Sequence, residues 1–176
     1  MKRKNINSKE GFTIIEVVLV LAIAGLIFLM VFIALPALQR SQRDTQRRDD
    51  MARFLSQINQ YQANNSGRVP ITKSGEQYTF DGSFISNYLE AGGDTFNDPS
   101  TGTVYTIADV KNCSPTDCPG SSDFGSIATA DKDERGKIHV YVNATCDGEN
   151  PKYINGERKI AIRIKLEGAG IYCGNS

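Results

Sequence analysis

The chain has 176 residues, with 20 basic and 20 acidic side chains, one His, four Cys and no Trp. Hydrophobic residues make up 40% and charged residues 23% of the sequence, which excludes a disordered or collagen-like composition and suits one domain of ordinary size. The formal net charge is zero, so no basic excess points to a nucleic-acid partner.

An apolar segment near the N-terminus carries the strongest signal. The run Val17–Leu35 has 19 residues, all of them Ala, Val, Ile, Leu, Met or Phe except Gly25. At about 1.5 Å per residue, a helix of this length nearly crosses a hydrocarbon core of about 30 Å. Residues 1–11 carry four basic side chains against one acidic side chain, which predicts a cytoplasmic N-terminus and an external C-terminal part.

A cleavable secretory signal is the alternative interpretation, because Ala22-Ile23-Ala24 has the small-x-small form of a cleavage site. Cleavage there would leave residues 25–35 as an exposed apolar tail, and it would place Glu16 within the apolar core of the signal. Both consequences favour a membrane-spanning helix.

Glu16 is an acidic residue within this apolar surrounding. A carboxylate inside a membrane costs about 2.5–3.5 kcal/mol on insertion scales, so it is expected to be functional and to have a partner. No Lys, Arg or His lies between Phe12 and Gln39. The cation that remains is a main-chain amine, which would exist if the chain were cut just before the apolar run.

The segment Lys9–Glu16, with the sequence KEGFTIIE, resembles the prepilin signature of type IV pilins and of the related pseudopilins of type II secretion and DNA-uptake machines. The resemblance rests on a short basic leader, a Gly-Phe pair, a Glu four residues after the Phe, and the long apolar run. It covers roughly the first forty residues. In combination these features are highly specific, whereas a Gly-Phe pair alone would mean nothing.

The resemblance implies that a membrane-embedded aspartyl peptidase cuts between Gly11 and Phe12 and methylates the new amino terminus of Phe12. It also implies that Glu16 neutralises the amino terminus of a neighbouring subunit during assembly. The implied partners are other pilin subunits in a homopolymer, the prepilin peptidase, an inner-membrane assembly platform with its ATPase motor, and membrane lipid. No cofactor and no nucleic acid are implied.

Beyond the apolar run the helix is expected to continue, with Pro36 as a residue at which it can kink. The next stretch is rich in Arg and Asp. The i,i+4 pairs Arg40/Asp44 and Asp49/Arg53 predict a solvated, salt-bridged helix face.

An apolar stripe with helical spacing follows and predicts a face that packs against a head domain. The stripe consists of Met51, Phe54, Leu55, Ile58 and Tyr61. Residues 64–67, with the sequence NNSG, predict the end of the helix. A helix from Phe12 to about Asn64 would be roughly 80 Å long.

The rest of the chain has short segments separated by Gly, Pro, Asn and Asp. We expect a short helix at 83–91, a turn at 97–102, a strand at 103–107, antiparallel strands with one buried face at 138–142 and 160–166, and an edge strand at 170–173. An antiparallel sheet packed on the amphipathic half of the long helix would use all of these apolar faces, which predicts an α+β fold. The resemblance implies the same arrangement, the ladle fold of type IV pilins.

All four cysteines lie in the part predicted to be external, where disulfides persist. Three pairings are possible. We favour Cys113–Cys118, which closes a Pro-containing loop, and Cys146–Cys173, which ties the chain's end to the strand region. The second pair resembles the usual C-terminal disulfide loop of the family. A zinc site is the alternative, but the short Cys113–Cys118 gap has no matching second pair.

Two segments suggest calcium without matching a calcium loop. Asp131–Gly136 begins like such a loop, but Arg135 and Val142 stand where ligands belong, so we favour an exposed turn. The segment from Asp98 to Tyr105 resembles the head of the major pseudopilins, which bind calcium. No metal ion is predicted.

Enzymatic motifs are not found in the sequence: it has no phosphate-binding loop, nucleophile elbow or metalloprotease motif. His139 has no Ser or Cys partner in a recognisable motif, so a surface histidine is expected. These observations argue against an enzyme.

The patterns together predict a structural subunit with four regions: a leader (1–11), the membrane and assembly half of the helix (12–38), its amphipathic half (39–64) and a disulfide-containing, β-rich head (65–176). The subunit would be a single-pass membrane protein that polymerises into an extracellular or envelope-spanning filament for attachment, twitching motility or DNA uptake. The alternatives are a pseudopilin of a type II secretion or competence machine and a single-pass anchor that displays a binding domain.

Overall fold

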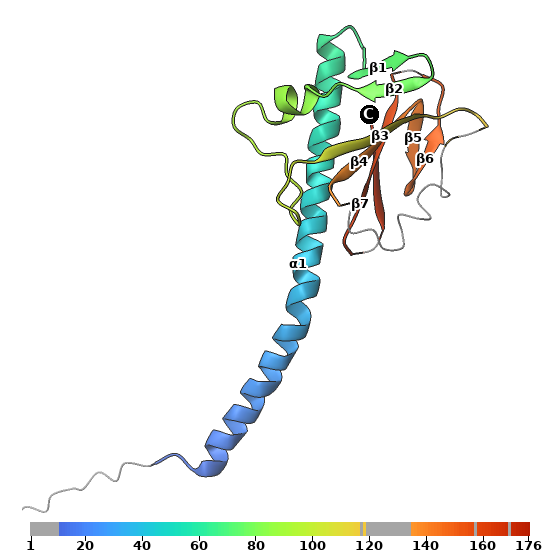
Figure 1. Ribbon diagram of the computed structural model, residues 1–176. Coiled ribbons are helices and arrows are strands. Elements are labelled where there is room, and N and C mark those ends of the chain that lie inside the picture. The colour runs from blue at the N-terminus through green and yellow to red at the C-terminus, as the bar shows by residue number, and fades with distance from the viewer. Residues whose placement is uncertain (1–10, 117, 119–134, 157, 169) are drawn as a thin grey trace, which may run out of the picture. The chain divides into compact units, whose positions relative to one another are not determined.

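The computed structural model describes residues 11–116, 118, 135–156, 158–168 and 170–176 (Figure 1). The chain divides into two compact units, residues 1–39 and residues 40–176. Helix α1 (Ile14–Asn64) contributes its N-terminal part to the first unit and its C-terminal part to the second. The other elements all belong to the second unit: β1 (Ile71–Ser74), β2 (Gln77–Phe80), η1 (Ile85–Leu89), β3 (Thr106–Asn112), β4 (Lys137–Val142), β5 (Ala144–Asp147), β6 (Asn150–Tyr153), β7 (Ile160–Lys165) and β8 (Ile171–Asn175).

The described part of the first unit is the apolar half of α1. Among the described residues, α1 is the one helix that is long and apolar enough to cross a membrane. Its large apolar side chains are exposed, because no other described residue of this unit covers them. Pro36 lies inside the helix.

The end of α1 follows the predicted stop signal. The helix ends at Asn64, and Ser66 and Gly67 have φ angles of 56° and 79°. The Gly67 amide donates to the carbonyl of Gln62 over 2.7 Å, which satisfies one of the last carbonyls of the helix. The left-handed conformation at Gly67 suits a residue without a Cβ.

The predicted stripe on α1 forms the centre of the second unit's core. Met51, Phe54, Leu55 and Ile58 are buried, and Tyr61 packs against the same cluster. Strands β4 and β7 contribute Ile138, Val140, Ile160, Ile162 and Ile164, and the segments between β2 and β3 contribute Phe84, Leu89, Phe96 and Tyr105. The prediction that a sheet packs on the amphipathic half of the helix is therefore confirmed.

The main sheet has four strands in the order β3-β4-β7-β8. As expected, β4 and β7 are antiparallel, with Val140 opposite Ile162, and β8 is an edge strand. The prediction of a purely antiparallel sheet is wrong, because β3 runs parallel to β4. Parallel neighbours require a long crossover, and the connection between β3 and β4, residues 113–136, is long enough to return the chain to the same end of the sheet.

The second face of the sheet is also covered, which corrects the prediction of one buried face. Tyr141 and Ala161 point away from the helix-side core and form a second cluster with Cys113 and Ala144. The hairpin β5–β6, which was not predicted, contributes to this cluster. Strand β7 is consequently buried along nearly its whole length.

Three short elements differ from the sequence-based prediction. The expected helix at 83–91 is a single π-helical turn, η1. The expected strand at 103–107 begins at Thr106, because the preceding residues form a turn in which Asn97 and Val104 make an isolated bridge. The hairpin β1–β2 was not predicted, and it lies beside the C-terminal end of α1 (Figure 1).

Candidate functional site

The predicted cleavage site lies just before the helix. Gly11, Phe12 and Thr13 are outside α1, and the Thr13 carbonyl accepts hydrogen bonds from the amides of Glu16 and Val17 over 3.1 and 3.3 Å. The side chain of Phe12 is 85% exposed, and a Cβ added to Gly11 would meet no other atom within 4 Å. The bond between Gly11 and Phe12 thus joins two exposed residues that lie outside the helix.

Glu16 is exposed and lies in the first turn of α1. This position places its carboxylate near the unpaired amides of the helix start, which favour a negative charge. Within residues 11–39, Glu16 forms no ion pair, and the sequence of that segment has no basic side chain.

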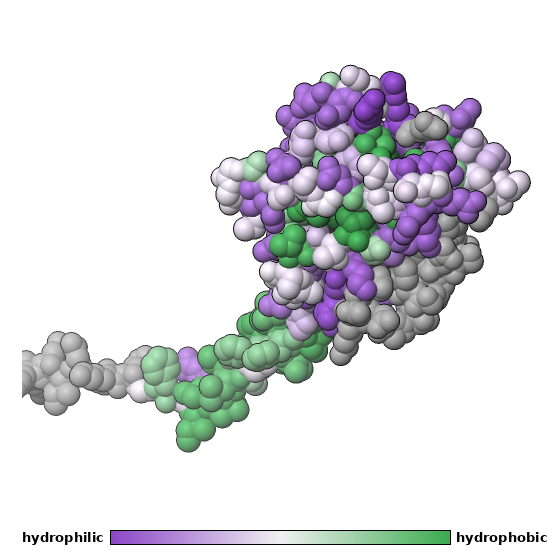
Figure 2. Space-filling model, turned by 45° about the horizontal axis from the view of Figure 1, so that its top comes forward, coloured by the Kyte–Doolittle hydropathy of each residue, from purple (hydrophilic) through white to green (hydrophobic). Residues whose placement is uncertain are grey.

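The helix around Glu16 carries exposed apolar side chains along its length, and on the side drawn in Figure 2 they form a continuous hydrophobic surface. A helix that is apolar all round is not stable alone in water and requires lipid or other apolar surface around it. The exposed large apolar residues of the first unit are Phe12, Ile14, Ile15, Val17, Val18, Leu19, Val20, Leu21, Ile23, Leu26, Ile27, Phe28, Leu29, Met30, Val31, Phe32, Ile33, Leu35 and Leu38.

In the second unit, the most polar buried feature is an ion cluster centred on Arg47. Arg47 Nε lies 2.6 Å from Asp98 Oδ2, and Arg47 Nη2 lies 3.0 Å from Asp98 Oδ1, with both side chains fully buried. The same Nη2 also donates to Ser100 and to Glu167 over 2.7 and 3.2 Å. Arg43 forms a second ion pair with Glu167, in which Arg43 Nη2 lies 2.7 Å from Glu167 Oε2.

Asp44 extends this cluster to the turn after β7. Its two carboxylate oxygens accept hydrogen bonds from the backbone amides of Glu167 and Gly168 over 2.7 and 2.8 Å. The prediction of a solvated helix face is therefore wrong for Arg43, Asp44 and Arg47, which hold the helix to two loops. Arg53 likewise donates to the carbonyl of Leu89 over 2.8 Å.

The charges of the cluster are mutually stabilised. Burial acts to raise the pKa of the Asp98 carboxyl, but hydrogen bonds from Arg47 and Ser100 outweigh it and lower the pKa to about 2. Burial likewise opposes ionisation of Glu167, but its contacts with Arg43 and Arg47 lower the pKa of that carboxyl. Asp50 differs, because burial raises its pKa despite a hydrogen bond from Tyr105.

The Asp98 segment was considered for calcium because of its resemblance to pseudopilin heads. Both oxygens of the Asp98 carboxylate are engaged by Arg47, and Oδ1 also accepts from the Ser100 and Thr101 amides. No group of three or more potential metal ligands occurs among the described residues. Most of the second candidate, Asp131–Gly136, lies outside the described residues.

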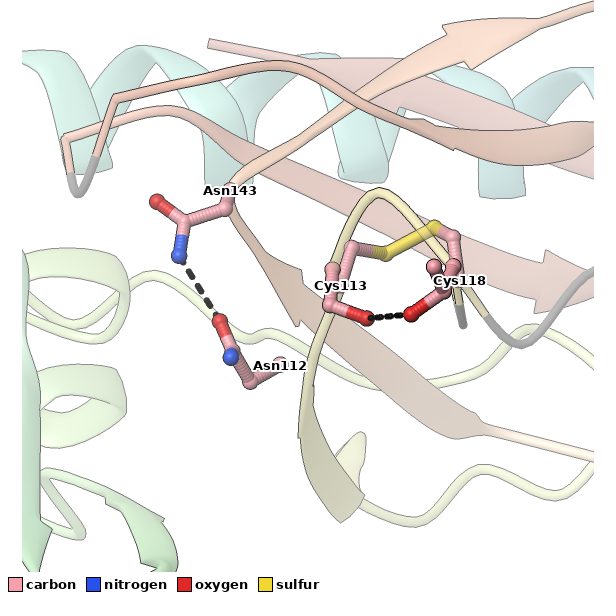
Figure 3. The surroundings of a disulfide bond; sticks show 6 residues. Asn112, Cys113, Cys118 and Asn143 are labelled. Atoms are coloured by element: carbon pink, nitrogen blue, oxygen red, sulfur yellow. Dashed lines mark hydrogen bonds between the residues drawn. A yellow bond between two sulfur atoms is a disulfide. The ribbon is translucent and has the colours of Figure 1, made fainter.

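The four cysteines form two disulfides, Cys113–Cys118 and Cys146–Cys173, which are the two pairs favoured from the sequence. Beside the first, Asn143 donates to the side chain of Asn112 over 2.7 Å (Figure 3). The second joins the hairpin β5–β6 to the edge strand β8. Both disulfides stabilise the second face of the sheet.

His139 was expected at the surface, but its side chain is 13% exposed and belongs to a polar pair on β3 and β4. Its Nδ1 lies 2.6 Å from the carboxylate of Asp109, which Lys111 also contacts. Burial raises the pKa of Asp109, but the contact with His139 outweighs it and leaves the pKa lowered. The arrangement is a polar contact between the neighbouring strands β3 and β4.

Sequence reasoning missed the partnership of Arg47 with Asp98, although one signal was present. Arg47 lies four residues before Met51 and so continues the apolar stripe of α1. A charged residue on a buried stripe requires a buried partner. The sequence alone did not show which of the acidic residues in the head supplies it.

The chain matches no protein-family model, no curated protein and no solved structure.

Proposed function

We propose that the chain is a pilin-like subunit, which is made with a leader, cut between Gly11 and Phe12, methylated at Phe12 and polymerised through α1 into a filament. The observation that carries this proposal is the position of Glu16, an exposed carboxylate in the first turn of a helix whose surroundings are entirely apolar. The N-terminal signature KEGFTIIE supports the same function.

Pairing between subunits explains why assembly is favourable. An isolated carboxylate in an apolar medium is costly, and so is an isolated amino terminus. Opposite charges attract strongly in such a medium, so pairing Glu16 with the Phe12 amine of a neighbour removes both costs at once. The contact would also fix the register of one helix against the next.

The apolar surface of α1 must be covered both before and after assembly. In the membrane, this surface contacts lipid; in a filament, it contacts the same surface of other copies. The head, held by the Arg47 cluster and two disulfides, would then form the outer layer of an external fibre. A head stabilised by two disulfides favours a surface pilus for attachment, twitching motility or DNA uptake over a secretion pseudopilus.

A glutamate substitution tests this proposal in cells that carry a prepilin peptidase and a pilus assembly motor. Glu16→Gln keeps the size of the side chain and removes its charge, so we expect a processed, membrane-inserted subunit that enters sheared surface fibres poorly. Glu10→Gln is the matched control, because it removes an acid from the part that is discarded. Normal fibre yield from Glu16→Gln would contradict the proposed role of the charge.

The same experiment separates a pilin from a single-pass anchor. An anchor that displays a binding domain would keep residues 1–11, remain in the membrane fraction and give no fibres from the unmodified chain either. Fibres from the unmodified chain and from Glu10→Gln, but not from Glu16→Gln, support the pilin.

A further inference from the structure

An open cavity of about 750 Å³ lies at the C-terminal end of α1, between the helix end, strand β1 and Arg158 in the segment that precedes β7. Ligand sites commonly have volumes of about 300–1,000 Å³, so the cavity is large enough for a sugar residue or two. Its lining includes two arginines, Arg68 and Arg158, together with Tyr61, Thr72 and Asp81.

The two arginines of this cavity make no direct ion pair with the part of the chain that the structure describes. Neither the Arg68 nor the Arg158 guanidinium forms an ion pair or a hydrogen bond with the residues that the structure describes. Asp81, the acidic residue of the lining, uses Oδ1 to accept from the amide and hydroxyl of Ser83 over 2.9 and 2.7 Å. Two guanidinium groups against one carboxylate leave the described lining of the cavity with a net positive charge, which attracts an anion.

Contacts with the end of the helix hold Arg158 in place. Its carbonyl accepts a hydrogen bond from Gln62 Nε2 over 2.8 Å. Its guanidinium packs against Gly67, where an added Cβ would lie 2.7 Å from Nη1 and 2.9 Å from Cζ. A guanidinium positioned before the ligand arrives loses less conformational entropy on binding.

Tyr61 gives the cavity a rigid aromatic wall. Its ring centroid lies 5.8 Å from that of Phe84 and 5.4 Å from that of Tyr88, both in edge-to-face geometry. An aromatic ring held in this way offers contact area at a low entropic cost. Beside it, Asp81 Oδ2 accepts no hydrogen bond from the described residues and can accept one from a ligand hydroxyl.

We propose that this cavity binds an acidic saccharide, with the carboxylate of a uronate or sialate residue held by Arg68 and Arg158. The planar fork of a guanidinium matches a carboxylate, an apolar face of the sugar ring packs on Tyr61, and Asp81 accepts from a ring hydroxyl. The site belongs to the head, so the inference does not depend on leader cleavage or on polymerisation.

Titration of the full chain in non-ionic detergent tests the assignment. The probes are digalacturonate, sialic acid, neutral galactose and inorganic phosphate, with binding measured by calorimetry and by saturation transfer to the sugar protons. We expect one of the two acidic sugars to bind at a single site, with saturation transfer to its ring protons, and galactose and phosphate to bind at least tenfold more weakly. Phosphate binding as tight as that of the acidic sugars, or no binding of either acidic sugar, would overturn the proposal.

Variants at the cavity locate the site. Arg158→Gln and Arg68→Gln are each expected to weaken binding about tenfold or more, because each removes a charge-assisted contact. Arg40→Gln is the matched control: Arg40 is an exposed arginine on α1 outside the cavity, and its loss should leave the affinity unchanged. An equal loss from Arg40→Gln would show a general charge effect and contradict the site.

A conservative variant distinguishes a carboxylate-binding fork from simple positive charge. Arg158→Lys keeps the charge and removes the fork, and it should bind the acidic sugar several-fold more weakly than the unmodified chain while unfolding at the same urea concentration. Unchanged affinity in Arg158→Lys would contradict the assigned geometry.

Discussion

Arg47 and Asp98 form a fully buried ion pair, with Arg47 Nε 2.6 Å from Asp98 Oδ2, between the helix and the turn before β3. Removing two charges from water is costly, and the pair tolerates burial because further hydrogen bonds satisfy both groups. Ser100 and Glu167 bind the guanidinium, and the amides of Ser100 and Thr101 bind the carboxylate. The pair thereby sets the position of the turn on the helix.

Removing one partner should be strongly destabilising. Arg47→Ala leaves Asp98 as a buried charge without its main counterion, and we expect the free energy of unfolding to fall by about 3–5 kcal/mol. The chain has no Trp, so urea unfolding in non-ionic detergent is best followed by the near-ultraviolet circular dichroism of its tyrosines. Arg40→Ala, at an exposed position of the same helix, should change the free energy of unfolding by no more than about 0.5 kcal/mol.

A double-mutant cycle tests whether the two residues act as one unit. Arg47→Met combined with Asp98→Asn should be less destabilising than the sum of the two single changes, with a coupling energy of about 1–3 kcal/mol. Additive effects would show that the two side chains stabilise the head independently.

The pair should also make the head sensitive to acid. The folded-state pKa of Asp98, about 2, lies below its ordinary value of 3.8, so the folded state favours the ionised form. Its contribution to stability, about 2 kcal/mol, is then present above about pH 4 and is lost as the pH falls toward 2. The loss of unfolding free energy caused by Asp98→Asn should shrink between about pH 5 and pH 2. If Asp98→Asn lowered the free energy of unfolding equally at every pH in this range, Asp98 would not have the lowered pKa assigned to it here.

The disulfides should differ in their effect on stability. Cys146–Cys173 spans 27 residues and Cys113–Cys118 spans 5, and the loop-entropy model gives contributions of about 3.5 and about 2 kcal/mol. Paired Cys→Ser variants in each disulfide should therefore lower the urea midpoint more for the longer loop. A larger effect from the short loop would mean that strain or burial dominates over loop entropy.

Leader removal should depend on the size of residue 11. Gly11→Leu places a branched side chain at the cut, where the unmodified residue has open space, and we expect the precursor to accumulate uncut in the membrane. Electrophoretic mobility with an antibody against the head reports the outcome, and Gly25→Leu, within the apolar helix, is the control for added bulk. Normal processing of Gly11→Leu would exclude a cut at this bond.

Periodicity in the sequence predicted the apolar faces that pack between the helix and the sheet. The stripe from Met51 to Ile58 and the alternating apolar residues of β4 and β7 face the same core, so the helix, the two strands and their packing follow from the pattern, although the other face of β7 is buried as well. The end of the helix was equally predictable, because Gly67 takes a conformation that other residues avoid.

The sequence pattern did not predict the contacts between residues that lie far apart in the chain. The parallel pairing of β3 with β4 depends on the path of the connection between them, and the burial of Tyr141 depends on a hairpin with no strong local signal. The partner of Arg47 lies 51 residues away, and local spacing carries no information about it. The arginine-lined cavity was missed for the same reason, because Arg68 and Arg158 are brought together by the fold.

The mass and N-terminal sequence of the subunit in sheared surface fibres test leader removal and polymerisation together. We expect fibres whose subunit begins at Phe12, continues to Ser176, carries one added methyl group on its amino terminus and contains no free thiol. A subunit that begins at Met1 or at Gly25, or a chain that is found only in the membrane fraction with no fibres, would contradict this expectation.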